Sequence, residues 1–144
     1  MPHTTLATSL VDNHGTRDPF QIAHDFGIII IETPLEGVRG FYQSAYGQQI
    51  IYVDNRLPEL ERLWVCAHEL GHAMLHSGLN RLFMDRRTHM VSSRYEMEAD
   101  RFAVDLLVSD DDLLEICDYP ISTVAQCLGV SPDIAEYRLS GLTK

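Results

Sequence analysis

The stretch at residues 63–76, LWVCAHELGHAMLH, decides the expected fold and chemistry of the whole chain. Its apolar side chains recur at helical spacing and form one stripe: Leu63, Ala67, Leu70 and Met74. Pro58 suits the first turn of a helix, and Gly78 suits its exit. The segment therefore predicts a helix of about 20 residues, roughly 30 Å long.

The same helix carries an H-E-x-x-H motif, His68-Glu69-Leu70-Gly71-His72. Residues four apart lie above one another on a helix, so both imidazoles can bind one zinc ion. Glu69 is turned about 100° from His68 and can reach a water molecule at the metal, where it would act as general base. Two histidines on a solvated helix face are the alternative, but the predicted helix and the motif agree.

A catalytic zinc site needs a third protein ligand, and a second predicted helix over residues 94–108 offers one. Glu96 and Asp100 share a face of this helix. Glu96 is the favoured ligand, with Asp100 or no carboxylate as the alternatives, and Glu96 could instead complete a capping box with Ser93. If Glu96 binds the metal, Asp100 is well placed to accept the free N–H of a ligand histidine. Glu98 should point elsewhere.

Three further residues have weaker claims on the site. His76 continues the face of His72 and could line the cleft, pair with Asp100 or sit favourably near the helix end. A direct metal role for His76 would close the site and remove the open position that catalysis needs. Tyr95 and His89 are each candidates to polarise the scissile carbonyl, although a tyrosine at a helix start more often packs.

A basic loop is predicted between the two helices, over residues 80–92. It carries Arg81, Arg86 and Arg87 against a single acid, Asp85. The loop could dock an acidic substrate segment near the cleft, but a solvated loop is the simpler interpretation.

The rest of the chain predicts one α+β domain over residues 18–144, preceded by a loose polar segment over residues 1–17. Strands are predicted at residues 28–31, 41–46 and 49–53, the last two as a hairpin around Gly47. Short helices are predicted after Asp18-Pro19 and, in the tail, over residues 110–117, 121–128 and 132–139.

Composition limits the class of protein. The chain has 144 residues, 45% hydrophobic and 22% charged, which fits one globular domain. No apolar run is long enough to span a membrane, and no basic and apolar leader opens the chain. Cys66, Cys117 and Cys127 are far apart, so reduced thiols in a cytoplasm are expected, with Cys66 in the core. The net charge is −10, and residues 96–144 hold 11 acids against 3 bases, which disfavours nucleic acid as a partner.

Two stretches together resemble the ImmA/IrrE family of zinc metallopeptidases. They are HELGHAMLH at residues 68–76 and EMEADRFA at residues 96–103, and the similarity extends over about residues 18–140. The resemblance implies a small gluzincin-like fold, in which a three-stranded sheet lies beside the zinc helix.

The resemblance also implies roles for individual residues. By the family pattern, one zinc ion is held by His68, His72 and Glu96, and Glu69 is catalytic. Such proteins are typically encoded by mobile elements, prophages and stress-response loci of bacteria, and the implied reaction is hydrolysis of a peptide bond in a helix-turn-helix repressor. Many members carry a proline just after the second helix, where this chain has VSD at residues 108–110.

Two other function classes are weighed against this one. Residues 124–131 resemble half of a helix-turn-helix with Gly129 at the turn, which would suit a DNA-binding regulator with a degenerate zinc domain. The acidic surroundings of that segment argue against DNA binding. The other class is a module that sequesters a repressor without cutting it, but the intact Glu69 argues for catalysis.

Overall fold

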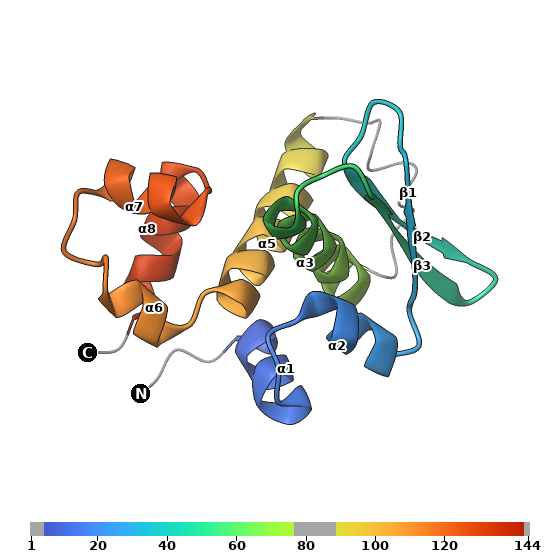
Figure 1. Cartoon of the computed structure of the whole chain (residues 1–144), viewed down its shortest axis with the longest axis horizontal. Helices are drawn as coiled ribbons and strands as arrows, with labels where there is room; N and C mark the ends of the chain where they lie inside the picture. The colour runs from blue at the N-terminus through green and yellow to red at the C-terminus, as the bar shows by residue number, and fades with distance from the viewer. Residues whose placement is uncertain (1–4, 77–88, 143–144) are drawn as a thin grey trace.

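Two long helices lie side by side at the centre of the molecule: α3 (Glu59–Leu75) and α5 (His89–Leu107) (Figure 1). The computed structural model describes residues 5–76 and 89–142. A three-stranded sheet lies on one side of the helix pair, and shorter helices gather at the far end of α5. The predicted α+β class is confirmed, and both predicted long helices are present.

The remaining elements are short. Before α3 the chain forms α1 (Leu6–His14), α2 (Pro19–Asp25), β1 (Ile29–Thr33), β2 (Gly40–Ala45) and β3 (Gln48–Asp54). After α5 it forms α6 (Asp110–Leu114), α7 (Ile121–Leu128) and α8 (Pro132–Ser140). Across the described part of the chain, none of the helices has the length and apolar character that a membrane span requires.

The sheet has the strand order β1-β3-β2, with β3 parallel to β1 and antiparallel to β2. β2 and β3 form the predicted hairpin, and its turn holds Tyr46 and Gly47 at positive φ, 52° and 79°. Positive φ at both central residues matches the twist of the flanking strands, and glycine adopts it without strain. The turn therefore sets the register that brings β2 to the edge of the sheet.

One face of the sheet packs on α3 and forms the main core. Tyr42, Ile51 and Val53 belong to it and are at most 3% exposed. Cys66 of α3 is fully buried in the same core, as predicted, and burial raises the pKa of its thiol. This packing fixes the orientation of α3 against the sheet.

α3 and α5 come close together at Gly71. A Cβ atom at this position would lie 3.1 Å from Cδ1 of Phe102 and 3.2 Å from the Cα of Ala99. The absence of a side chain lets the two backbones approach, which allows side chains on the facing surfaces of the two helices to meet.

Gly71→Val should lower the free energy of unfolding by about 1–3 kcal/mol, because its methyl groups would overlap Phe102 and the backbone of α5. Urea denaturation of the variant and the wild type measures the difference. Leu60→Val serves as the control, since Leu60 lies on the same helix and is 67% exposed. Equal urea midpoints for Gly71→Val and the wild type would show that the helices are not tightly packed at this position.

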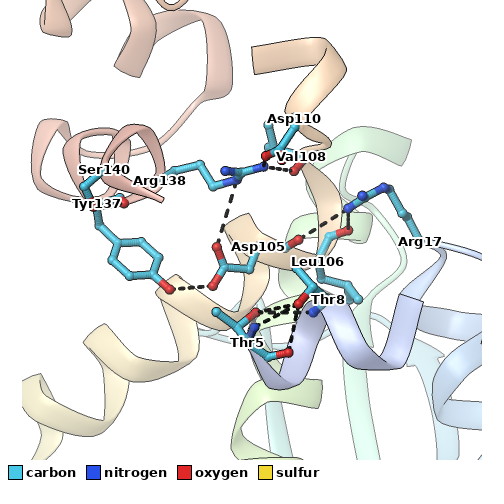
Figure 2. A network of polar contacts seen from close by, with 10 residues as sticks. All are labelled: Thr5, Thr8, Arg17, Asp105, Leu106, Val108, Asp110, Tyr137, Arg138 and Ser140. Atoms are coloured by element: carbon cyan, nitrogen blue, oxygen red, sulfur yellow. Dashed lines mark hydrogen bonds and ion pairs between the residues drawn. The ribbon is translucent and has the colours of Figure 1, made fainter. Parts of the chain in front are cut away.

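The N-terminal residues differ from the loose segment predicted over residues 1–17. α1 is an ordered helix, and its side chains Ala7 and Leu10 are buried in the main core. Arg17 donates a hydrogen bond of 2.9 Å to the backbone carbonyl of Leu106 in α5 (Figure 2). Apolar burial and this bond hold the segment against the second long helix.

The C-terminal helices form a second core against the end of α5. Val104 of α5 and Val108, the residue that follows this helix, contribute to it, together with side chains of α6, α7 and α8. Asp105, only 3% exposed, accepts a hydrogen bond from the hydroxyl of Tyr137 (Figure 2). Arg138 is also buried and donates to the carbonyl of Val108 at 3.0 Å. These contacts fix α8 on α5.

Tyr137→Phe should lower the free energy of unfolding by about 1–3 kcal/mol, because the buried carboxylate of Asp105 loses a donor. Phenylalanine keeps the ring over which the guanidinium carbon of Arg101 lies at 4.8 Å, so the loss reports on the hydroxyl. Thermal or urea unfolding measures it, with Tyr119→Phe as the control because Tyr119 is 56% exposed. A variant as stable as the wild type would show that the hydrogen bond contributes nothing net.

The boundaries of α5 exclude the capping box that Glu96 could have formed with Ser93. The helix begins at His89, before the predicted start at residue 94, so Ser93 lies inside it and cannot cap it. At the other end, the side chain of Ser109 accepts a hydrogen bond from the backbone N–H of Asp112 and caps α6. The chain therefore passes from α5 into α6 through a turn capped by a serine.

Candidate active site

His68 and His72 lie one turn apart on α3 and meet Glu96 of α5. Nε2 of His68 lies 2.9 Å from Oε2 of Glu96, and Nε2 of His72 lies 2.7 Å from Oε1. The two imidazoles meet edge to face, with ring centroids 4.9 Å apart. The three side chains predicted as ligands are therefore brought together from two different helices.

This group has the composition and the spacing of a metal site. One ligand atom from each of the three residues lies within 4.8 Å of the other two. Tetrahedral bonds of about 2.0–2.1 Å place ligand atoms about 3.3 Å apart, so small side-chain rotations would admit an ion. Two imidazoles and one carboxylate are also a donor set found in catalytic metal sites.

The charge inside the group is set by hydrogen bonds between its members. Burial alone would lower the pKa of His68, but hydrogen bonds to Asp100 and Glu96 outweigh it and raise the pKa to about 10. Burial would raise the pKa of Glu96, but hydrogen bonds to His68 and His72 hold it well below its usual range. At neutral pH the metal-free group thus holds a proton where a metal ion would bind, and binding has to displace it.

Asp100 orients His68 from the side away from Glu96. Its Oδ1 lies 2.8 Å from Nδ1 of His68, so the carboxylate accepts that N–H and Nε2 is directed at Glu96. This is the arrangement expected if Glu96 is the ligand. The alternative in which Asp100 itself binds the metal loses support, because its carboxylate faces the other ring nitrogen.

His76 and Glu98 form a pair beside His72, which corrects the prediction that Glu98 points elsewhere. Nε2 of His76 lies 3.0 Å from Oε1 of Glu98, and Nδ1 of His76 lies 2.9 Å from Nδ1 of His72. His76 therefore pairs with Glu98 and not with Asp100. The ring of Tyr95 packs edge-on against His76, with centroids 4.7 Å apart, and does not line the cleft.

Glu69 follows His68 on α3 and lies outside the three-residue group. It is 8% exposed and lines the cleft beside the group. A Cβ atom at Gly40, the first residue of β2, would lie 3.7 Å from Cγ of Glu69 and 2.5 Å from Cγ1 of Val65. The edge strand β2 can therefore approach α3 this closely only because residue 40 is a glycine. Glu69 lies beside that strand and lines the cleft.

An open cleft of about 870 Å³ runs from His68 and Glu96 to the C-terminal helices. Its walls come from α3, α5, the start of β2 and the turn between α7 and α8. Side chains outside the metal group that line it include Arg39, Trp64, Ala103 and Ile134, together with residues 126–131. Its size is at the upper end of ordinary ligand pockets, which suits an extended ligand.

The sequence matches the IrrE N-terminal-like domain of the M78 peptidases over residues 23–140. The chain belongs to this family. It is therefore a metallopeptidase of the ImmA type. Within residues 5–76 and 89–142, the group of His68, His72 and Glu96 could hold the metal.

Two relatives align over nearly the whole chain. Immunity region protein 2 of Bacillus phage phi105 is 32% identical over 143 residues, which cover 95% of this chain and 90% of that protein. Metallopeptidase ImmA of Bacillus subtilis (strain 168) is 28% identical over 138 residues, which cover 92% of this chain and 80% of that protein.

The sequence did not predict every residue of this ImmA-type site, and some of the predicted residues lie outside the described part of the chain. Glu98 and the turn at residues 126–131 were missed; the turn was interpreted as part of a helix-turn-helix, but it lines the cleft. His89 begins α5, but its side chain is outside the described residues. The same holds for the basic residues of the predicted loop, Arg81, Arg86 and Arg87.

Proposed function

We propose that the chain is a zinc-dependent endopeptidase that hydrolyses a peptide bond in a cytoplasmic helix-turn-helix repressor and so relieves repression. The observation that carries the proposal is the meeting of His68, His72 and Glu96 beside Glu69 in an open cleft. The relatives support it, since one is named a metallopeptidase and another an immunity region protein. An immunity function in a phage fits a substrate that represses phage genes.

His68, His72 and Glu96 would hold one zinc ion. When bound, zinc acts as a Lewis acid that makes water more acidic and polarises a carbonyl oxygen. A set of three protein ligands leaves a position open, which is the composition of a catalytic site and not of a closed structural one. The side chain of Glu96 is 48% exposed, which supports an opening on the cleft side.

Glu69 is the residue best placed to move protons. Its carboxylate would take a proton from the water that attacks the scissile carbonyl, and would give a proton to the leaving nitrogen as the C–N bond breaks. Asp100 does not suit this role, because its carboxylate is held by the ring of His68. Glu69 lines the cleft, and Glu96 is engaged by both histidines.

The charge of the cleft favours a protein substrate over a nucleic acid. Among the described residues that line it, Arg39 is the one arginine, and it lies 3.5 Å from Glu61 and is thereby partly neutralised. The acidic side chains that line it are Glu61, Glu69, Glu96 and Asp100. A phosphate backbone would meet like charge along these walls. The turn at residues 126–131 adds a wall with no charged side chain, which suits a peptide.

Co-production with the repressor encoded beside the gene tests this function. The wild-type chain should convert the repressor into two fragments, and the Glu69→Gln chain should leave it intact, as read by mass spectrometry of the recovered repressor. An intact repressor that co-purifies with both chains would contradict hydrolysis and indicate sequestration. Salt-sensitive binding of the isolated chain to duplex DNA, without cleavage, would indicate a DNA-binding regulator.

A further inference from the structure

Two successive hydrogen bonds connect His72 to Glu98 through His76. Nδ1 of His72 lies 2.9 Å from Nδ1 of His76, and Nε2 of His76 lies 3.0 Å from Oε1 of Glu98. His72 and His76 are 5% and 4% exposed, whereas the side chain of Glu98 is 40% exposed. The buried imidazole of His76 thus connects a predicted metal ligand to a carboxylate near the surface.

The donor and acceptor capacities of these three side chains determine which ring nitrogen carries each hydrogen. An ionised carboxylate only accepts hydrogen bonds, so Nε2 of His76 carries a hydrogen that it donates to Glu98. A neutral imidazole has one N–H, so Nδ1 of His76 is an acceptor. The hydrogen between the two Nδ1 atoms therefore belongs to His72. Nε2 of His72 lies 2.7 Å from Oε1 of Glu96, and it has to give up the hydrogen of that contact before its lone pair can bind a metal ion.

We infer that His76 and Glu98 are positioning residues for the zinc site on which the proposed function rests. Together they would fix which ring nitrogen of His72 faces the ion and how the ring is turned. Histidine ligands usually have their second nitrogen held by a carboxylate, a carbonyl or water. His68 follows that pattern directly through Asp100 at 2.8 Å, whereas His72 reaches its carboxylate through an intervening imidazole.

The surroundings of His76 keep it in this orientation. Its backbone N–H donates to the carbonyl of His72 at 2.8 Å at the end of α3, and Tyr95 packs against its ring. Both histidines are almost completely buried, so water has little access to the contact between their rings. Removal of the acceptor on His76 would take away the hydrogen bond that the structure gives Nδ1 of His72 in a buried position, and the loss of a buried hydrogen bond is costly.

Substitutions at both positions test the role through zinc affinity. His76→Phe keeps an aromatic ring but removes the acceptor, and we expect the zinc Kd to rise about 10–100-fold. Glu98→Ala should shift the Kd in the same direction, and Glu98→Gln, whose amide oxygen still accepts, should restore most of the affinity. Competition with a chromophoric zinc chelator measures each Kd, with Glu136→Gln on the exposed face of α8 as the charge-matched control.

The ring N–H of His72 gives a second readout, by NMR of the zinc-loaded protein with isotope-labelled histidine. In the wild type we expect this hydrogen to exchange slowly with water, because it is donated to a buried acceptor. His76→Phe should speed its exchange and leave the His68 N–H, which Asp100 holds, unchanged. A general loss of structure would speed the exchange of both ring N–H hydrogens. Faster exchange at His72 alone would therefore show that His76 positions that ring.

Unchanged zinc affinity and unchanged exchange of the His72 N–H in a folded His76→Phe protein would overturn the inference. If that variant does not fold, the Glu98 variants decide, because a Glu98→Ala protein with the wild-type Kd contradicts it. Neither readout depends on proteolysis. A wild type that binds zinc and protects the His72 N–H but cuts no repressor contradicts the proposed function alone, and one that binds no zinc contradicts both.

Discussion

Glu69→Gln should lower the turnover of the repressor by about 10²–10⁴-fold and leave the zinc content unchanged. Glutamine has nearly the same shape as glutamate, but its amide cannot take a proton from the attacking water. Glu69 lies outside the group that could hold the metal, so the substitution removes no ligand. The rate of fragment formation by the two purified, zinc-loaded proteins measures the loss.

The matched control for this substitution is Glu59→Gln. Glu59 lies in the first turn of α3 and is exposed, so the variant changes the same charge on the same helix away from the cleft. The Glu59→Gln protein should cleave the repressor at close to the wild-type rate. Near-normal turnover by Glu69→Gln would remove Glu69 from the mechanism, and loss of its zinc would place the residue in the metal site instead.

His72→Ala should abolish near-stoichiometric zinc binding. The substitution removes one of the three side chains proposed as ligands, and the expected weakening of zinc binding exceeds the 10–100-fold that is typical of a lost supporting hydrogen bond. Elemental analysis after dialysis against metal-free buffer should give about one zinc per wild-type chain and little in the variant.

His24→Ala is the histidine control for that measurement, because the side chain of His24 is 84% exposed on α2. It should keep the zinc content of the wild type. Equal zinc in His72→Ala and in the wild type, with both proteins folded, would exclude His72 as a ligand.

The elements that follow from local sequence were predicted correctly. The apolar stripe of α3 and the spacing of His68 and His72 depend on residues within a few turns, and so does the hairpin at Gly47. The meeting of Glu96 with both histidines was also expected, because the H-E-x-x-H motif demands a third ligand and the second helix offers few carboxylates. Local signals and the needs of one chemical site were sufficient for these features.

The N-terminal helix was missed although the sequence contained its signals. Ala7 and Leu10 are three apart and both are buried, which is helical spacing, and Thr5 caps the helix by accepting a hydrogen bond from Thr8. The polar character of the segment as a whole hid this short pattern. Its stability depends on contacts with α5, which no local pattern describes.

The roles of Glu98 and of the turn at residues 126–131 could not be read from helical geometry alone. A position two residues after Glu96 lies on another face of the helix, but the long side chain of Glu98 reaches His76 where α3 and α5 pack together. The turn reaches the cleft because α8 is held on α5 by the second core. Both depend on how whole helices pack, and not on residues close together in sequence.

Hydrolysis itself is tested most directly with the purified, zinc-loaded chain and the purified repressor in water enriched in oxygen-18. We predict two fragments whose masses together equal the repressor plus one water, with one heavy oxygen in the new carboxyl group, and no fragments with Glu69→Gln. A repressor that stays intact with the wild-type chain, or the same fragments from the Glu69→Gln chain, would contradict it.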